Sequence, residues 1–534
     1  MRKAERSKVW KLTDKIILNW MDCGALMMEQ EKYGIIDIGS NTIRLVIYTK
    51  GKNGQFTESD NIKVVARLRN YLSEEGILED KGIKVLIDTL LSFQEVTRHH
   101  RLKDIKCVAT AAIRQAKNQQ AIIDKVQTET DYTMRILSEF EEANYGYLAV
   151  VNSMPYTDGI TIDIGGGSTE LTLFRDRQLI HYHSFPFGAL SLKRNFVEGN
   201  MPTQAEIEAL RSFLASQFAE LEWLSDKRLP LIGIGGSARN VAQIHQEYVE
   251  YPLSGVHQYV MSKQDISEMN GRMQSFNFSE MQRIEGLSKD RADIIIPAVE
   301  VFGFLMEVIG TEEFALSRKG LREGVFYEEM RKEFELSILP DILEESFQEL
   351  AADFDIDLTH AFHVAGSALM IAQKLEEAGL ASLKEDYERI KVSGTLYNLG
   401  SYIDAESSNQ HTFYLLCNRT IDGLLHKERV IIALIASFKN KAAFKRNAAP
   451  FEEWFTKEEL NRYSLLGAII KLAYCLNATK RDIVEKIHLE KNGEELVFFI
   501  QSRKDWKPEQ YQAEKQKKHL EKQLKKTIHI QFYK

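Results

Sequence analysis

Alternation of apolar and polar positions predicts two similar hairpins in the first part of the chain. In residues 159–174, GITIDIGGGSTELTLF, Ile160 and Ile162 alternate with polar side chains, a run of glycines follows, and a second alternating stretch completes the pattern. Residues 33–50, YGIIDIGSNTIRLVIYTK, have the same order of apolar strand, Asp-Ile-Gly, hydroxyl side chains and apolar strand. The repeat predicts two copies of one domain, each built on a hairpin.

Strands that run into helices follow each hairpin. Residues 105–109 predict a strand that continues into a helix, on which Arg114 and Asn118 are spaced to share one face. Residues 229–244, LPLIGIGGSARNVAQI, predict a strand, a Gly-Gly-Ser turn and a helix that begins near Arg239. Because strands and helices alternate in this way, we expect an α/β fold in this part of the chain.

The predicted elements divide the chain into five segments. A chain of 534 residues can form several domains with full cores, and after about residue 335 the apolar pattern becomes helical almost throughout. The expected segments are 1–31, an N-terminal extension; 32–152 and 153–332, the two α/β domains; 333–480, a helical domain; and 481–534, a small α+β unit.

The last segment contains a strong turn signal. Asn492 and Gly493 lie between two alternating stretches and predict a hairpin with a type I′ turn. A highly charged helix is expected from Pro508 to Lys526, followed by a final strand from Thr527 to Tyr533.

The first segment does not fit a targeting signal. MRKAERSKVWK is basic, but the apolar stretch after it is interrupted by Asp14, Lys15 and Asp22, whereas a signal peptide has an unbroken apolar core. We expect an amphipathic or disordered extension, or a later start of translation at Met27 or Met28.

Bulk composition narrows the possible partners. The net charge of −8 means that an anionic substrate must meet a local basic patch, and it argues against a dedicated nucleic-acid binder. No window approaches 18 uncharged apolar residues, so no membrane span is expected. Cys23, Cys107, Cys417 and Cys475 are far apart, which favours buried thiols in a reducing, cytoplasmic location.

The glycine turn of the second hairpin is a candidate phosphate site. Gly165, Gly166 and Gly167 carry no Cβ, so the turn can take positive φ and let an anion approach successive backbone N–H groups. Ser168 adds a hydroxyl donor, and Asp163 can hold a hydrated cation opposite the phosphates. The equivalent turn in the first hairpin predicts a pair of phosphate loops that face each other across a cleft.

Two further features each have two explanations that the residues alone leave open. Arg114 suits a phosphate, but a lone arginine there also fits a surface salt bridge. Ser138 can cap a helix whose first turn contains Glu139, Glu141 and Glu142. These acids fit the helix dipole, and one of them could equally serve as a general base.

Taken together, the motifs resemble the exopolyphosphatase / guanosine pentaphosphate phosphohydrolase family. They cover roughly residues 33 to 330 in the family's order, and as a set they are highly specific. They read IDIGSNTIRLVI, ATAAIRQAKN, SEFEEANYGYLAV, IDIGGGSTELTLF, IGIGGSARNVA, LSKDRADIIIPA and LSRKGLREGV. The resemblance implies two ribonuclease-H-like domains, as in actin and the Hsp70 ATPase core, that flank a phosphate-holding cleft.

The resemblance also assigns roles to residues. It implies Asp37 and Asp163 for Mg²⁺, Glu142 as the general base, and Gly39, Ser40, Asn41, Arg114, Gly165, Gly166, Gly167 and Ser168 for phosphate. The chain departs from the family at Ser138-Glu139, where many members have Ser-Gly.

The helical segment resembles the HD-like domain of the longer family members. His360 and His363 lie where a first metal-binding histidine would fall. Tyr397 and Asn398 stand where HD phosphohydrolases have a His-Asp pair, and they are poor substitutes for metal ligands. We therefore expect a degenerate HD fold without a metal, which lengthens a basic channel or makes a dimer contact.

The activity implied by the resemblance is processive, Mg²⁺-dependent hydrolysis of terminal phosphate from inorganic polyphosphate, with orthophosphate released. Removal of the 5′ γ-phosphate from guanosine pentaphosphate is the nearest alternative, and no residue separates the two substrates. A non-catalytic sensor of polyphosphate or alarmone is a third possibility, against which Glu142 and both Asp-Ile-Gly loops argue. A homodimer is expected.

Overall fold

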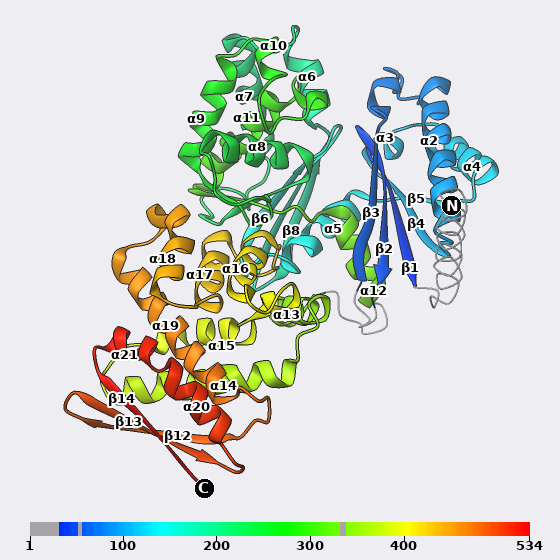
Figure 1. The fold of residues 1–534 in the computed structure, drawn as a ribbon. Helices are drawn as coiled ribbons and strands as arrows, with labels where there is room; N and C mark the ends of the chain where they lie inside the picture. Colours follow the sequence, from blue (N-terminus) through cyan, green and yellow to red (C-terminus); the bar gives the residue numbers. More distant parts are fainter. Residues whose placement is uncertain (1–30, 52–55, 332–337) are drawn as a thin grey trace, which may run out of the picture. The chain divides into compact units, whose positions relative to one another are not determined.

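The computed structural model describes residues 31–51, 56–331 and 338–534, so almost all of the predicted N-terminal extension lies outside the described residues (Figure 1). The chain forms two compact units, which meet in sequence between Ser138 and Glu139. Within the described ranges, none of the helices has both the length and the apolar character that a membrane crossing requires. Each unit is described below by itself.

The first unit is built on a five-stranded sheet with the strand order β3-β2-β1-β4-β5. The first three strands pair antiparallel, whereas β4 is parallel to both β1 and β5. Apolar side chains of β1, β2 and β4 form one core with those of the helix α2. The elements are β1 Lys32–Ile38, β2 Thr42–Lys50, β3 Phe56–Val65, η1 Leu68–Tyr71, α2 Asp80–His99, β4 Asp104–Ala109, α3 Ala111–Arg114, α4 Gln119–Glu129 and β5 Met134–Ile136.

The second unit contains a sheet that repeats this arrangement, in the order β10-β11-β9-β6-β7-β8. Read from β8 to β11, its strands have the same order and directions as β3 to β5, and β10 is an added antiparallel edge. The strands are β6 Gly159–Ile164, β7 Thr169–Arg175, β8 Gln178–Phe185, β9 Leu231–Ile234, β10 Val260–Ser262 and β11 Glu313–Leu316.

The registers of the two hairpins are also equivalent. Asp37 pairs with Arg44 across β1 and β2, and Asp163 pairs with Glu170 at the matching position of β6 and β7. The sequence repeat therefore corresponds to a repeated three-dimensional unit. The position that faces the aspartate is equivalent in the two hairpins, although the residue there differs.

Helices lie on both faces of the second sheet. Helices α7, α8, α9 and α11 gather on one side (Figure 1), and α11 packs against the other three. Helix α5 packs on β6, β7 and β8 and against α12. The helices are α5 Glu139–Val151, α6 Ala189–Phe196, α7 Gln204–Ala219, α8 Gly235–Tyr248, α9 Lys263–Gln274, α10 Phe278–Met281, η2 Lys289–Arg291, α11 Ile295–Ile309 and α12 Leu321–Arg331.

The contacts of α5 explain where the two units divide. We expected the first domain to extend to residue 152, whereas the compact units divide before α5. Tyr147 of α5 packs beside Phe174 of β7, and its hydroxyl donates to the Arg177 carbonyl at 2.7 Å. Helix α5 therefore belongs, by its contacts, with the sheet that follows it in sequence.

The C-terminal part of the second unit is a helical domain with one mixed sheet. Its helices are α13 Ile342–Asp353, α14 Leu358–Glu377, η4 Lys384–Asp386, α15 Tyr387–Thr395, η5 Leu399–Tyr402, α16 Ser408–Asn418, α17 His426–Ala436, α18 Lys441–Ala448, η6 Ala449–Trp454 and α19 Lys457–Leu476. They are followed by β12 Val484–Asn492, β13 Glu495–Ser502, α20 Lys507–Gln516, α21 Lys518–Leu524 and β14 Thr527–Tyr533.

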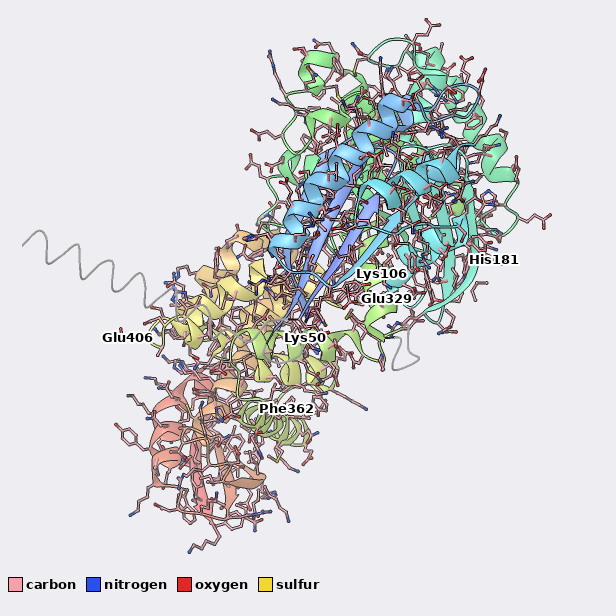
Figure 2. All side chains as sticks on the ribbon, turned by 90° about the vertical axis from the view of Figure 1, so that its right-hand side faces the viewer. Lys50, Lys106, His181, Glu329, Phe362 and Glu406 are labelled. Carbon is pink, nitrogen blue, oxygen red and sulfur yellow. The ribbon has the colours of Figure 1, made fainter. Side chains whose placement is uncertain are left out.

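One core joins the two segments that we expected to divide at residue 480. Ile487, Phe498 and Ile530 of the three-stranded sheet are buried in the same apolar cluster as Ile371 of α14 and Ile469 of α19. On the other side of α14, Phe362 faces outward and is 48% exposed (Figure 2). The helical region and the small α+β unit are therefore packed as one domain, here called the third domain.

Three local predictions were wrong for identifiable reasons. Helix α3 ends at Arg114, because the Asn118 side chain instead bonds both the N–H and the C=O of Leu78 at 3.0 Å. Asn492 pairs with Glu495, so the turn consists of residues 493 and 494. A type I′ turn needs positive φ at both of its central residues, but of these two only Gly493 has it. The expected long helix near the C-terminus is divided at Lys517 into α20 and α21.

The contact between α12 and α5 gives a test of the packing. A Cβ added to Gly324 would lie 2.1 Å from the Tyr145 carbonyl oxygen, closer than real Cβ contacts. We expect Gly324→Ala to lower the free energy of unfolding by about 1–3 kcal/mol, because the two helices must separate. Gly366 on α14 meets no atom within 4 Å, so Gly366→Ala should raise stability by about 0.5–1 kcal/mol. Thermal and urea unfolding measure both, and equal effects of the two changes would contradict the packing described.

Candidate functional site

The glycine loop between β6 and β7 is held by backbone contacts. The Gly165 N–H donates to the Ser168 carbonyl at 3.0 Å, which closes the turn. The N–H groups of Ala189 and Leu190, at the start of α6, donate to the carbonyls of Gly165 and Gly166 at 2.9 and 3.1 Å. The loop is therefore fixed against a helix N-terminus before any ligand binds.

Glycines in and beside this loop allow neighbouring backbone segments to approach it closely. Gly39 and Gly165 do not have left-handed φ, contrary to the expectation of positive φ for the turn. A Cβ at Gly188 would lie 2.5 Å from the Gly165 carbonyl oxygen, so α6 can reach the loop only with glycine there. The left-handed glycine beside the site is Gly235, with φ of 81°, which leads into α8. The predicted helix start near Arg239 was therefore too late, because α8 begins at Gly235.

A buried carboxylate lies opposite Asp163. Glu170 pairs with it across the hairpin and is only 4% exposed. The Ser184 hydroxyl donates to one Glu170 oxygen at 3.0 Å. Burial, followed by the negative charges of Glu142 and Asp163, raises the pKa of Glu170 well above its ordinary value. The structure thus brings two predicted site residues together with a third carboxylate that our sequence analysis missed.

The signal for Glu170 was present in the sequence. Asp163 and Glu170 lie at mirrored positions around the glycine turn, each one residue outside the closing pair of Ile164 and Thr169. Because directly paired residues of a hairpin point to one face of the sheet, the register alone places the two carboxylates side by side.

A half-buried arginine, Arg291, lies on another side of Asp163. A Cβ at Gly235 would lie 2.3 Å from an Asp163 carboxylate oxygen, and one at Gly236 would lie 2.1 Å from Nη2 of Arg291. Arg291 also donates from Nη1 to the Ser237 hydroxyl at 3.2 Å. Burial lowers the pKa of Arg291, and the charges of Asp290 and Asp163 oppose that shift. Because neither glycine of the turn has a Cβ, the turn leaves room for the Arg291 guanidinium close to Asp163.

More arginines surround the start of α8. Arg239 donates from Nη2 to the Arg318 carbonyl at 3.4 Å. Burial lowers the pKa of Arg239, as do the positive charges of Arg322, Arg318 and Arg291, while Glu323 acts in the opposite direction. This cluster is a local basic patch of the kind that an acidic chain requires to meet an anion. Its members belong to the motifs quoted above, but no role had been predicted for them.

The first unit presents its own loop. The Gly39 N–H donates to the Thr42 carbonyl at 3.0 Å, which matches the closure of the Gly165 turn. The Asn41 side chain is 7% exposed, and among the described residues neither its amide nitrogen nor its amide oxygen has a hydrogen-bond partner. Because a buried unpaired amide is costly, this side chain is well suited to a ligand that supplies the missing bonds. Arg114 donates from Nη1 to the Leu137 carbonyl at 3.0 Å.

The cysteines in the described residues are buried thiols, as predicted. Cys107, Cys417 and Cys475 are free and buried, and Cys23 lies outside the described residues. Burial, with a smaller contribution from the charge of Asp37, raises the pKa of Cys107 to about 12. The thiol is therefore protonated at neutral pH.

The predicted site residues fall into two groups. The first unit contains Asp37, Gly39, Ser40, Asn41 and Arg114, and the second contains Glu142, Asp163, Gly165, Gly166, Gly167 and Ser168. Within each unit the residues lie on the same hairpin or on the element beside it, as the repeat predicted.

The donor set beside the second loop suits a hard cation. No group of three or more His, Cys, Asp and Glu side chains in the described ranges is arranged to hold a metal ion by itself. Mg²⁺ is usually bound through one or two carboxylates, with water and substrate phosphate completing the shell. Asp163 and Glu170 provide two facing carboxylates. Glu170 is buried, and it is repelled by the negative charge of Asp163. The residues present therefore fit such an ion.

The histidines of the third domain pair with neighbouring side chains. Nδ1 of His360 accepts from the Asn477 amide at 3.0 Å, and the Asn398 amide donates to the Tyr474 hydroxyl at 3.2 Å. Asn398 adopts a left-handed conformation with φ of 69°. The helical prediction for this region holds, whereas its likeness to an HD fold stays a prediction.

The repeated sheets, each with a glycine loop at the turn of its first hairpin, define a protein of the actin-like fold class. Residues 46–333 match the Ppx/GppA phosphatase family, and residues 342–525 match domain III of Ppx/GppA phosphatases. The chain therefore belongs to the Ppx/GppA phosphatase family, as the motifs indicated. The prediction of a hydrolase acting on phosphoanhydride bonds is confirmed at this level.

Curated relatives carry two different names. A protein of Pseudoalteromonas translucida named guanosine-5'-triphosphate,3'-diphosphate pyrophosphatase is 24% identical over 427 residues, which cover 77% of this chain and 81% of the relative. A Mycobacterium tuberculosis protein named exopolyphosphatase 1 is 24% identical over 307 residues, which cover 57% of this chain and 89% of the relative.

Solved structures agree on the fold. The Aquifex aeolicus member of the Ppx/GppA family is 27% identical with a TM-score of 0.51, and the match covers 57% of this chain and all of that one. A Cytophaga hutchinsonii exopolyphosphatase is 22% identical with a TM-score of 0.52, covering 57% of this chain and 98% of its own.

The raised pKa of Glu170 predicts a pH effect on stability. At pH values above the ordinary glutamate pKa of about 4.5, the folded chain keeps a proton on Glu170 that the unfolded chain loses. The free energy of unfolding therefore falls as pH rises through the folded-state pKa of Glu170. We expect this fall to be smaller in Glu170→Gln, which carries no charge, when melting temperatures are compared from pH 5 upward without divalent metal. Glu222→Gln on the surface is the control, and identical pH profiles for wild type and Glu170→Gln would disprove the shift.

Proposed function

We propose that this protein is an exopolyphosphatase, which hydrolyses terminal phosphate from inorganic polyphosphate processively and releases orthophosphate. The observation that carries the proposal is the group of Glu142, Asp163 and Glu170 beside a glycine loop, in a chain of the Ppx/GppA phosphatase family. Carboxylates next to a phosphate loop suit hydrolysis, because they can activate water and hold a cation. The relative named exopolyphosphatase 1, matched over 89% of its length, supports this substrate.

Glu142 is the proposed general base. It lies in the first turn of α5, close enough to Glu170 for its charge to affect the pKa of that side chain. A carboxylate in this position can orient an attacking water and take its proton, a contribution typically worth about 10²–10⁴ in rate. Glu170, which is buried, has no access to bulk water and is assigned to the cation instead.

The two loops and Arg114 are proposed to bind phosphate. Backbone N–H groups of Gly166 and Gly167 suit phosphoryl oxygens, whereas those of Gly39 and Gly165 close their own turns. The Asn41 amide, which has no partner among the described residues, adds a fixed donor. Arg114 offers a guanidinium with one of its nitrogens anchored on the Leu137 carbonyl, which limits its freedom before substrate arrives.

Asp163, Glu170 and, in the first unit, Asp37 are the residues proposed to hold Mg²⁺. When bound there, the ion would offset charge on the phosphate oxygens. Burial and the neighbouring carboxylates of Glu142 and Asp163 raise the pKa of Glu170. A bound cation would oppose this shift by stabilising the ionised form of the side chain, which supports the assignment.

Hydrolysis of guanosine pentaphosphate is the second candidate. It is favoured by relatives named guanosine-5'-triphosphate,3'-diphosphate pyrophosphatase, whose match extends over 77% of this chain, beyond the two repeated sheets. The arginine cluster around Arg239 would also suit a substrate with phosphates at two ends.

Replacement of the proposed base gives a direct test. Glu142→Gln should keep the fold and polyphosphate binding but lose about 10²–10⁴ of kcat, because the amide takes no proton. Phosphate release and filter binding measure the two properties, and Glu139→Gln in the same helical turn is the matched control. Near wild-type turnover in Glu142→Gln would remove the base assignment.

A comparison of substrates decides the proposal. We expect Mg²⁺-dependent phosphate release from long polyphosphate, with a higher kcat/KM than from guanosine pentaphosphate, and complete loss of both activities with a chelator. A higher kcat/KM for guanosine pentaphosphate would favour the second candidate. Binding of either compound without phosphate release, at any Mg²⁺ concentration, would make the protein a sensor instead of an enzyme.

A further inference from the structure

The helix that carries Glu142 is anchored at its far end by the third domain. The Ser153 carbonyl, just beyond the end of α5, accepts from the Gly423 N–H at 3.0 Å and from the Gln258 side chain at 2.9 Å. The Asn152 side-chain oxygen accepts from the Leu339 N–H at 2.6 Å. Two segments of the third domain, around residues 339 and 423, thus hold the C-terminal end of this helix.

Asp422, the residue next to Gly423, forms a half-buried ion pair with Lys319, which lies two residues before α12. Lys319 donates to the Asp422 carboxylate and, at 2.9 Å, to the Tyr327 hydroxyl. His257 lies 3.3 Å from the other Asp422 oxygen. Burial alone would raise the pKa of Asp422, but the Lys319 ammonium and His257 hold it at about 2. The pair is therefore charged at neutral pH and costly to separate.

Helix α12, which begins two residues after Lys319, packs directly on α5. Gly324 lies so close to Tyr145 that a Cβ would meet the backbone of α5 at 2.1 Å. The Tyr145 hydroxyl also donates to the Glu328 carboxylate at 2.8 Å. Glu329, the next residue, marks this helix in Figure 2. A displacement of Lys319 is therefore passed to α5 through a contact that has no free space.

We propose that the Asp422–Gly423 turn of the third domain is a positioning element for Glu142. The turn contacts the end of α5 directly, through the hydrogen bond from Gly423 to Ser153. It also contacts α5 indirectly, because Asp422 pairs with Lys319, and α12, which follows Lys319, packs on α5. The proposal rests on the proposed function of Glu142 as the base. Because a small misplacement of a catalytic group lowers the rate more than it weakens binding, the turn should govern kcat.

A second ion-paired carboxylate of the third domain provides a control. Asp386 is fully buried and pairs with Arg389 at 2.9 Å and with Arg462. All three residues belong to the third domain. Asp386→Asn and Asp422→Asn each remove one carboxylate charge from between two basic partners, but only Asp422 lies next to the contact with α5.

The test compares these two variants by hydrogen exchange, melting temperature and steady-state kinetics in the full chain. Both should melt at lower temperature. Only Asp422→Asn should speed amide exchange in α5 and lower kcat for polyphosphate about ten-fold or more, with KM changed less than about two-fold. Gly423→Ala is a second variant at the turn, strained because Gly423 has φ of 84°, and it should act in the same direction.

Three results would overturn the positioning role. They are an equal loss of kcat in Asp386→Asn and Asp422→Asn, unchanged exchange in α5 for both variants of the turn, and a change confined to KM. If the wild-type protein releases no phosphate from any substrate, the proposed function fails, while exchange in α5 still decides whether the turn holds the helix.

Discussion

The crowding of negative charge on the second sheet is the constraint around which the catalytic region is arranged. Asp163 and Glu170 face each other by register, and Glu142 comes from a helix packed over the same face. Like charges at such close quarters are stable only with a proton or a cation nearby. The half-buried Arg291 supplies one positive charge near Asp163, and a divalent ion of the proposed chemistry would supply more.

Precise placement of these carboxylates requires a stiff support. The glycine loop is closed by its own turn and fixed against α6, while α5 is packed on three strands and on α12. Elements of this kind hold side chains better than free loops do. The third domain contributes to the same support, since Asp422 forms a half-buried ion pair with Lys319, two residues before α12.

Much of this organisation is visible in the sequence, because it depends on short-range patterns. The two hairpins of the repeat, the α/β class and the helical character after about residue 335 follow from periodicity. Asn118 was misassigned because its side chain bonds the backbone of a residue that is distant in sequence, which no local pattern reports. The arginines around Arg239 escaped assignment for the same reason, since loops far apart in the chain bring them together. Glu170 is different, because strand register alone would have placed it beside Asp163.

The equivalent registers of the two hairpins have a consequence for how a repeated domain acquires separate tasks. The position that faces the aspartate is Arg44 in one copy and Glu170 in the other. Aspartate therefore faces a cationic side chain in the first hairpin and a second carboxylate in the other. The two copies share a backbone register but differ in local charge, so exchange of Arg44 and Glu170 between them would reverse the charge beside each aspartate.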